Sequence, residues 1–276
     1  MPVRPLTFRE LLDVPFALVQ ANIKVLAAVG AVGLVLAELF VVWITLTVAT
    51  FTDDSDAGIR WGAIVAMLAA AWALRFLLRG LTVALGLADV AGRRLGWQAA
   101  LHRLRATAIP LLLFELPYTL IWTVVFGVLA FLVTAAPGGG VALLVVLVLL
   151  VLPFVGWLRA RHYVAAPVVF AEQAARSTAE ARTKLLVSGK TWSLAGLWLA
   201  HRGLLLLLLL PLFGLWLFVS DYSGTRMWTV VTLTTTVLLL FLAFGEIVEA
   251  ATRVVCYLDL RCRREGIDIR IPEQVR

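Results

Sequence analysis

The sequence predicts an all-α protein: a polytopic bundle of six transmembrane helices with amphipathic helices on its cytoplasmic surface. Of its 276 residues, 62% are hydrophobic and only 15% are charged, whereas soluble domains average roughly 45–50% apolar and about 25% charged residues. Several apolar runs exceed the ~18 residues that mark a transmembrane helix. These runs are continuous, whereas the strands of a membrane barrel alternate in polarity. A helical membrane protein is therefore expected.

Residues 1–22 are predicted to form a cytoplasmic interfacial segment. Charged residues are mixed there with Leu, Phe and Val at near-helical spacing, which indicates a short helix, broken at Pro15. The first apolar run, Val25–Phe51, is far longer than the ~7–15-residue core of a cleavable signal peptide. We therefore expect it to be retained as the first span.

The other spans are apolar runs separated by short polar or Gly- and Pro-rich loops such as "TDDSDAG", "APGGG" and "SDYSG". The six predicted spans are Val25–Phe51, Ile59–Ala88, Ile109–Val133, Val141–Leu158, Gly203–Val219 and Met227–Val248. The fifth span has an alternative start at Trp192, and the sixth helix is expected to continue to Leu260. A single membrane domain thus covers residues 1–276, with the bundle at 25–260 and a cytoplasmic tail at 261–276.

The distribution of Lys and Arg orients this bundle. The loops at 52–60, 134–140 and 220–226 hold only Arg60 and Arg226 of the 24 basic residues. Basic residues are enriched on the cytoplasmic side, so both termini are predicted to be cytoplasmic. The net charge of +7 then reflects cytoplasmic loops that face anionic lipid, and no nucleic-acid partner is expected. The few lysines among abundant Ala, Val, Leu and Gly indicate a bacterial plasma-membrane protein.

The segment "GRRLGWQAALHRLRATAIP" predicts a basic amphipathic helix on the inner leaflet. Its apolar face carries Trp97, Leu101, Leu104 and Ala108, and its basic residues gather elsewhere: Arg93, Arg94, His102, Arg103 and Arg105. A basic residue near an anionic bilayer contributes about 1 kcal/mol to membrane binding. The four arginines are therefore candidate contacts for lipid headgroups or for a protein partner.

A second surface helix is predicted at residues 177–188, before the fifth span. Ser177 and Glu180 have the spacing of a capping box, Glu180 and Lys184 form an i,i+4 pair, and Gly189 is expected to end the helix. Basic helices thus precede spans three and five. This is either a weak twofold repeat or the ordinary composition of cytoplasmic loops, and the second interpretation is favoured.

Ionisable residues inside the predicted spans are candidate functional groups, because a charge in a bilayer is costly. They are Glu38, Arg75, Arg79, Glu115 and Glu246. At ~1.5 Å per residue, Glu38 and Arg75 lie at similar depths, roughly 20 and 22 Å below the outer ends of their spans. This predicts a Glu38–Arg75 pair, and similar reasoning allows a Glu115–Arg79 pair. Two hypotheses remain: the charges form structural pairs, or they form a polar pathway for a headgroup, ion or proton.

No catalytic motif is present in the sequence. The three histidines are scattered, and the chain has no HExxH, GxSxG or P-loop pattern. Clustered ligands for a metal are also missing, and Cys256 and Cys262 match no redox motif. We therefore predict no catalytic residue, no metal, no cofactor and no enzymatic activity.

Two stretches carry a family resemblance. The inner loop "VAAPVVFAEQAARSTAEARTKLLVSGKTW" resembles the pattern A-x-x-R-S-x-x-L-x-x-G-x-x-W, with shifted spacing at Ser177 and Leu185. The tail "YLDLRCRREGID" resembles Y-x-D-L-R-x-R-R-E-G-x-D. Together they are similar to bacterial six-span membrane proteins, common in actinobacteria, that are related to the membrane domain of glycerophosphoryl diester phosphodiesterase. The catalytic barrel of that enzyme is missing here, so the resemblance implies an anchoring, lipid-facing or partner-binding module without hydrolase activity.

The function predicted from the sequence is that of a non-enzymatic membrane scaffold, anchoring or partner-binding module. Its tail arginines, Arg261, Arg263 and Arg264, are candidate contacts for anionic headgroups or for a membrane or cytosolic protein. The alternative is a small transporter or lipid-handling protein that uses the intramembrane Glu and Arg residues. A membrane-embedded enzyme acting on lipid is a third, weaker hypothesis. After Gly266, a predicted helix end, Ile and charged residues alternate, as in a short edge strand or a segment packed on a surface helix.

Overall fold

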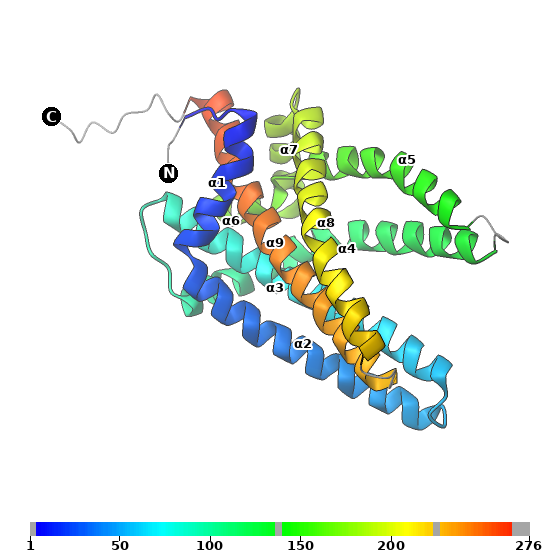
Figure 1. Cartoon of the computed structure of the whole chain (residues 1–276). Helices are drawn as coiled ribbons and strands as arrows, with labels where there is room; N and C mark the ends of the chain where they lie inside the picture. Colours follow the sequence, from blue (N-terminus) through cyan, green and yellow to red (C-terminus); the bar gives the residue numbers. More distant parts are fainter. Residues whose placement is uncertain (1–3, 136–139, 223–226, 267–276) are drawn as a thin grey trace. The chain divides into compact units, whose positions relative to one another are not determined.

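Long helices account for nearly all of the chain in the computed structural model (Figure 1). The structure describes the backbone of residues 4–135, 140–222 and 227–266, and their side chains except at 118, 121–150 and several positions between 209 and 227. The helices are α1 (Phe8–Ala21), α2 (Ile23–Phe51), α3 (Asp56–Val90), α4 (Trp97–Ala135), α5 (Gly140–Arg161), α6 (Ala165–Glu172), α7 (Arg176–Val187), α8 (Thr191–Tyr222) and α9 (Met227–Glu265). No strand occurs in these ranges, which confirms the predicted all-α class.

The chain divides into two compact units. The first unit takes in the described residues of Met1–Val14, His102–His201 and Thr252–Arg276, and the second takes in Pro15–Leu101 and Arg202–Ala251. Helices α1, α4, α8 and α9 each contribute residues to both units. This division does not test whether residues 1–276 form a single membrane domain, which stays a prediction.

The second unit is built on a hairpin of α2 and α3, which lie side by side (Figure 1). Asp53 and Asp54 turn the chain with positive φ angles of 48° and 55°, a backbone region that Asp tolerates because its short side chain bonds locally. Ser55 then caps α3, with its Oγ accepting a hydrogen bond from the Gly58 amide at 3.1 Å. The short loop predicted at "TDDSDAG" is therefore found, but its last three residues already belong to α3.

Small side chains hold the hairpin together. The buried cluster comprises Ala37, Val41, Ala66, Ala70, Leu74, Leu78, Leu239 and Ala243, from α2, α3 and α9. Alanine and glycine allow close approach of helix backbones, which is the main source of helix association inside a bilayer. A Cβ on Gly62 would lie only 3.0 Å from the Cβ of Val48, so the two helices are nearly in backbone contact there.

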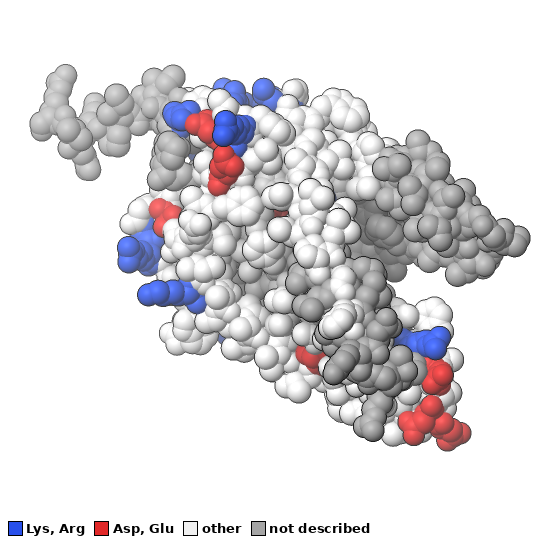
Figure 2. Space-filling view, viewed as in Figure 1, with Lys and Arg blue, Asp and Glu red and all other residues white. Residues whose placement is uncertain are grey.

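The outward face of α2 is strongly apolar. Leu36, Leu39 and Trp43 are 61%, 61% and 62% exposed, and the surface along this helix is almost free of charge in Figure 2. Soluble monomers rarely expose apolar patches of this extent. In the described residues, four helical segments are long and apolar enough to cross a membrane: Ile23–Phe51, Asp56–Val90, Thr191–Leu208 and Trp228–Glu265. These helices indicate a membrane protein.

The first unit contains the shorter helices. Helix α6 packs on α7, and α7 also contacts α5. The first residues of α6, Ala165–Val169, are almost completely buried. Gln173 ends α6 in the left-handed conformation, with φ of 48°, and this allows the chain to start α7 three residues later.

Most predicted spans coincide with helices. Spans one, two and six fall on α2, α3 and α9, and α9 continues beyond Leu260 to Glu265. Helix α8 begins at Thr191, so the long alternative for the fifth helix is confirmed as a helix. Spans three and four fall on α4 and α5, where many side chains lie outside the described residues. The loop "APGGG" is outside them from residue 136 to 139.

Two predicted helix boundaries are wrong. Pro15 lies inside α1, which continues to Ala21, because the fixed φ of proline is helical and only one backbone hydrogen bond is lost. The segment predicted as a separate surface helix begins at Trp97 and runs without a break into α4. The sequence there changes in polarity, but Pro110 does not interrupt the backbone.

The capping box is also found at a different place from the predicted one. Helix α7 begins at Arg176 with Ala175 as its N-cap, so Ser177 is already inside the first turn and makes no capping bond. The reciprocal pattern occurs at Thr7 and Glu10 instead: the Thr7 amide donates to Glu10 Oε2 at 2.8 Å, and Thr7 Oγ1 accepts from the Glu10 amide at 3.4 Å.

The predicted end of α7 is confirmed. Glu180 and Lys184 form an ion pair at 2.8 Å, and Gly189 has a φ of +76° immediately after the Ser188 cap. Gly266 likewise has a φ of +59° at the end of α9. The alternating residues that follow Gly266 lie outside the described residues.

Candidate functional site

A buried carboxylate between two arginines forms the centre of the charged residues in the second unit. Glu246 of α9 is 2% exposed and Arg79 of α3 is 1% exposed. Arg79 Nε lies 2.5 Å from Glu246 Oε1, and Arg75 Nε lies 2.9 Å from Glu246 Oε2. Arg75 and Arg79 are four residues apart, so both face the same neighbour on α9. Each carboxylate oxygen thus receives one guanidinium.

A second ion pair lies one turn further along α9. Arg202 of α8 pairs with Glu249, which is only 4% exposed. Charged groups this deeply buried are stable only with a partner, because desolvation of an isolated ion costs several kcal/mol. The two pairs therefore connect α3 and α8 with α9.

Glu38 of α2 belongs to a separate contact in the same unit. The Thr235 hydroxyl lies 2.7 Å from Glu38 Oε1. The other carboxylate oxygen, Oε2, is buried and has no hydrogen-bond partner among the described residues. Such a group is costly, which makes Glu38 a distinctive position in the second unit.

The contacts found for these charges differ from the Glu38–Arg75 and Glu115–Arg79 pairs considered from the sequence. The structure joins Arg75 and Arg79 to Glu246, while Glu38 meets Thr235. Glu115 Oε1 lies 3.9 Å from Nη1 of Arg253. Residue counts give the depth of a side chain along its helix, but they do not give the rotation of the helix or the identity of its neighbours.

A small pocket lies in the first unit, lined by residues of α4, α5, α6 and α9. Its polar lining consists of Glu115, Arg159, His162 and Arg253. The cavity has a volume of about 30 Å³, and a water-sized group needs at least about 10–15 Å³ by this measure. The pocket therefore has room for roughly two oxygen-sized groups.

Aromatic rings lie against both arginines of this pocket. The Arg253 guanidinium lies 5.4 Å from the ring centroid of Tyr163, and that of Arg159 lies 5.7 Å from the ring of Trp198. Such cation–π contacts favour the charged form and restrict the guanidinium plane. Burial lowers the pKa of His162 below its ordinary value, which favours the neutral ring. Two cations and one anion then give the lining a net charge of +1.

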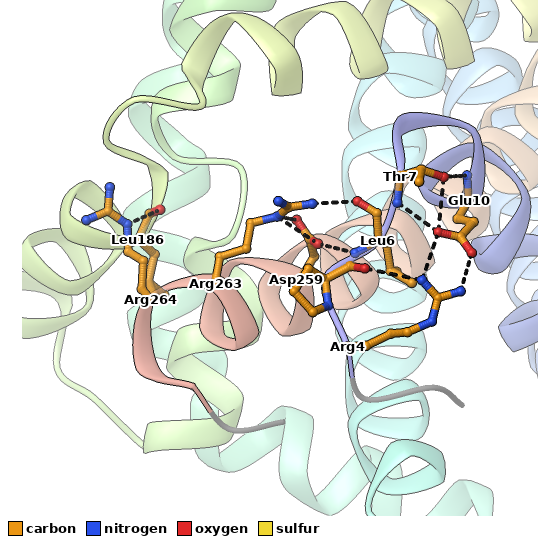
Figure 3. A network of polar contacts seen from close by, with 9 residues as sticks. Arg4, Leu6, Thr7, Glu10, Leu186, Asp259, Arg263 and Arg264 are labelled. Atoms are coloured by element: carbon orange, nitrogen blue, oxygen red, sulfur yellow. Dashed lines mark hydrogen bonds and ion pairs between the residues drawn. The ribbon is translucent and has the colours of Figure 1, made fainter. Parts of the chain in front are cut away.

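The end of α9 is tied to the N-terminal segment (Figure 3). Asp259 Oδ1 accepts a hydrogen bond from the Leu6 amide at 2.7 Å, and both of its oxygens accept from Arg263 Nε at 3.0 and 2.9 Å. Arg263 also donates to the Leu6 carbonyl at 2.5 Å. Arg4 pairs with Glu10 at 2.5 Å. The Thr7 backbone N–H, and then Arg4, lower the pKa of Glu10 to about 2.

The same end of α9 is tied to α6 and α7. Arg264 Nε donates to the Leu186 carbonyl at 3.2 Å (Figure 3) and Arg264 also donates to the Ser188 carbonyl. Arg182 bonds Glu172 at 3.1 Å and also pairs with Glu265. Burial opposes charge on Arg182, but its hydrogen bond to Glu172 and the nearby carboxylates raise its pKa above the ordinary value.

The predicted headgroup contacts therefore fall into two classes. Arg93, Arg94, Arg103 and Arg105 are exposed. The tail residues Arg261, Arg263 and Arg264 make contacts within the protein, since Arg261 also pairs with Glu265 at 2.8 Å. The first class remains available at the surface, whereas the tail arginines are occupied in fixing the end of α9.

The pocket was not predicted from the sequence. Arg253 lies in "EAATRVVCYL", where an ionisable residue follows a run of small residues and precedes an apolar stretch, and this signal marks a buried charge. Arg159 and His162 carried no comparable signal, because they lie in a basic segment that resembles any cytoplasmic loop. Only the packing of four helices brings them together.

No group of three or more His, Cys, Asp or Glu residues in the described part of the chain could hold a metal ion. Cys256 and Cys262 are buried thiols. Comparison of the chain with models of protein families, with curated proteins and with solved structures finds no match.

Proposed function

We propose that the chain is a non-enzymatic integral membrane protein of the bacterial plasma membrane and serves as a scaffold, anchoring or partner-binding module. It crosses the membrane six times and has both termini in the cytoplasm. The four apolar helical segments and the exposed apolar face of α2 support the membrane location. The acidic α2–α3 turn in Figure 2 supports an outer position for that turn, because cytoplasmic loops are enriched in basic residues.

The pairing of buried charges is the observation that carries the scaffold proposal. Glu246 is held between Arg75 and Arg79, and Glu249 is held by Arg202. A transport pathway needs ionisable groups that exchange partners with a substrate or with water. Carboxylates fixed between guanidinium groups are instead suited to holding helices in register.

The proposed kinship is with the membrane proteins related to the membrane domain of glycerophosphoryl diester phosphodiesterase. The tail pattern Y-x-D-L-R-x-R-R-E-G that suggested it corresponds to a set of contacts: Tyr257 with Glu172, Asp259 with Leu6, Arg261 with Glu265, Arg263 with Asp259, Arg264 with Leu186 and Glu265 with Arg182. We infer that the pattern fixes the end of the last helix. Contact with anionic headgroups is then assigned to the exposed arginines of the α3–α4 loop and the start of α4.

The test replaces the central ion pair by apolar side chains. Glu246→Leu alone should destabilise the protein in detergent by about 3 kcal/mol, because it removes the carboxylate that the buried Arg79 pairs with. Arg79→Met added to Glu246→Leu removes that buried cation as well, while Arg75, the other partner of Glu246, is partly exposed. The double variant should recover most of this loss. If the protein is a scaffold, expression of the double variant should also restore the phenotype of a strain that lacks the gene. A stable double variant that fails to restore the phenotype would contradict the scaffold proposal.

The alternative is a small transporter or lipid-handling protein. One observation favours it: Glu38 carries a buried oxygen without a hydrogen-bond partner among the described residues. If the protein is a transporter, Glu38→Gln keeps the shape of the side chain and removes its charge. This variant should then fail to restore the phenotype of a strain that lacks the gene, although the protein stays as stable as the unaltered chain. A scaffold tolerates Glu38→Gln because its Thr235 contact needs only one oxygen.

A further inference from the structure

We propose that the pocket of the first unit binds a phosphate-type oxyanion, either the headgroup of an anionic phospholipid or a free phosphate. The pocket is lined by other residues than those of the ion pairs on which the scaffold proposal rests. Its polar lining is Glu115, Arg159, His162 and Arg253.

The charge of the lining selects an anion. Two guanidinium groups face one carboxylate, which leaves a net charge of +1 around the cavity. Glu115 Oε1 lies 3.9 Å from Arg253 Nη1, a distance at which the two charges attract. Arginine matches the geometry of phosphate oxygens through its planar fork of N–H donors. The rings of Tyr163 and Trp198 hold the two guanidinium planes.

The start of α6 adds to the positive potential. Ala165 and Ala166, its first two residues, form part of the pocket wall. The first-turn amides of a helix carry a partial positive charge and point away from the helix body. Anions bind at such helix ends even without side chains. Here the Ala165 N–H donates to the His162 carbonyl at 3.1 Å and Pro167 has no N–H, so Ala166 is the first-turn residue whose N–H adds to the two arginines at this cavity.

The size of the pocket limits how a ligand enters. About 30 Å³ accommodates roughly two oxygens, so the rest of the ligand must remain outside. Leu111 and Phe114 of α4 form an apolar wall beside the charged one. A phosphodiester with an attached apolar part fits this arrangement, and a free phosphate fits the polar part alone.

The experiment uses the full chain in detergent. Binding of phosphatidylglycerol and of phosphatidylcholine is measured by native mass spectrometry, and inorganic phosphate is titrated separately by calorimetry. Arg159→Gln removes one cation and should weaken anion binding about fivefold, since one basic residue contributes about 1 kcal/mol. Glu115→Gln removes the competing carboxylate and should strengthen binding by a similar factor. A gain of affinity cannot result from general damage to the fold.

Arg161→Gln is the matched control. Arg161 is exposed, lies two residues from Arg159 and stacks on Trp157 at 3.9 Å without lining the pocket, so its loss should leave binding unchanged. Binding of phosphatidylglycerol alone assigns a lipid headgroup, whereas binding of inorganic phosphate as well assigns a free phosphate. The measurement with phosphatidylglycerol rests on the proposed membrane location, whereas the measurement with inorganic phosphate does not. A failure of the proposed function can therefore be distinguished from a failure of the anion site. If neither anion binds, or if the Arg159 and Glu115 variants bind as the unaltered protein does, the proposal is overturned.

Discussion

At the scale of single residues, the buried charges show which contacts a sequence can predict. Five ionisable residues interrupt apolar runs of the sequence, and each makes a polar contact in the structure: Glu38, Arg75, Arg79, Glu115 and Glu246. Their partners were not predictable. Two charged side chains at equal depth can form a pair only if their helices are adjacent and if both side chains face the contact. Both conditions depend on how the whole unit packs.

The same limit applies to capping. The pattern S/T-x-x-E occurs at Thr7–Glu10 and at Ser177–Glu180, yet only the first forms a capping box. At the second position α7 begins at Arg176 with Ala175 as its N-cap, and Ser177 falls inside the helix. The motif alone therefore does not fix the residue at which a helix begins.

Asp259 is expected to hold the N-terminal segment in place. It is 5% exposed and accepts hydrogen bonds from Leu6 and Arg263. Asp259→Asn removes the charge that both contacts use and should lower the free energy of unfolding by about 2 kcal/mol. It should also expose the bond after Arg9, which we would measure as faster cleavage by trypsin.

The control for Asp259 is Glu180→Gln. This change breaks the ion pair with Lys184, whose side chain is 64% exposed, and such surface pairs contribute at most about 1 kcal/mol. Trypsin cleavage after Arg9 should be unaffected by it. Equal protection of Arg9 in the Asp259 variant and the unaltered chain would show that the Leu6 contact does not restrain this segment.

At the scale of helices, apolar length was a reliable guide and polarity changes were not. The ranges of α2, α3 and α9 follow from continuous apolar runs, because such runs satisfy their backbone only as helices inside a bilayer. The short helix α6 escaped prediction, since its sequence "AAPVVFAE" contains Pro167 and is too short for helical periodicity. Its position at the pocket depends on its neighbours.

The α2–α3 contact should be sensitive to one added methyl group. A Cβ on Gly62 would lie 3.0 Å from Val48 Cβ and 3.3 Å from its Cγ1. Val48 Cβ is fixed to the backbone, so Gly62→Ala must push the helices apart and should cost about 1–3 kcal/mol of stability. The unfolding midpoint in detergent measures this loss.

Gly30→Ala is the matched change on the other helix. The nearest atom to its added Cβ is Leu78 Cδ2 at 3.9 Å, an ordinary van der Waals contact. Alanine is favoured over glycine in a helix by about 1 kcal/mol, so this variant should be as stable as the unaltered chain or more stable. Shifts of the midpoint in the same direction for both variants would contradict the close contact at Gly62.

At the scale of the whole molecule, the number and direction of membrane crossings decide which residues meet the cytoplasm. The charge pattern of the sequence supports six crossings, because Lys and Arg are nearly excluded from the three predicted outer loops. The division into two units was not apparent in the sequence, since four helices belong to both units and no linker marks a boundary.

Single cysteines read by a membrane-impermeant maleimide test the six-span topology directly. Cys256 and Cys262 are 1% and 4% exposed, so the native background should be silent. Asp54→Cys in the α2–α3 turn should react in intact cells, and Lys190→Cys before α8 should react only after permeabilisation. Gly138→Cys separates six crossings from four: it reacts in intact cells if α4 and α5 both cross, and only after permeabilisation if neither does. Labelling of Lys190→Cys in intact cells together with protection of Asp54→Cys would reverse the proposed orientation, and with it the cytoplasmic position of the exposed arginines.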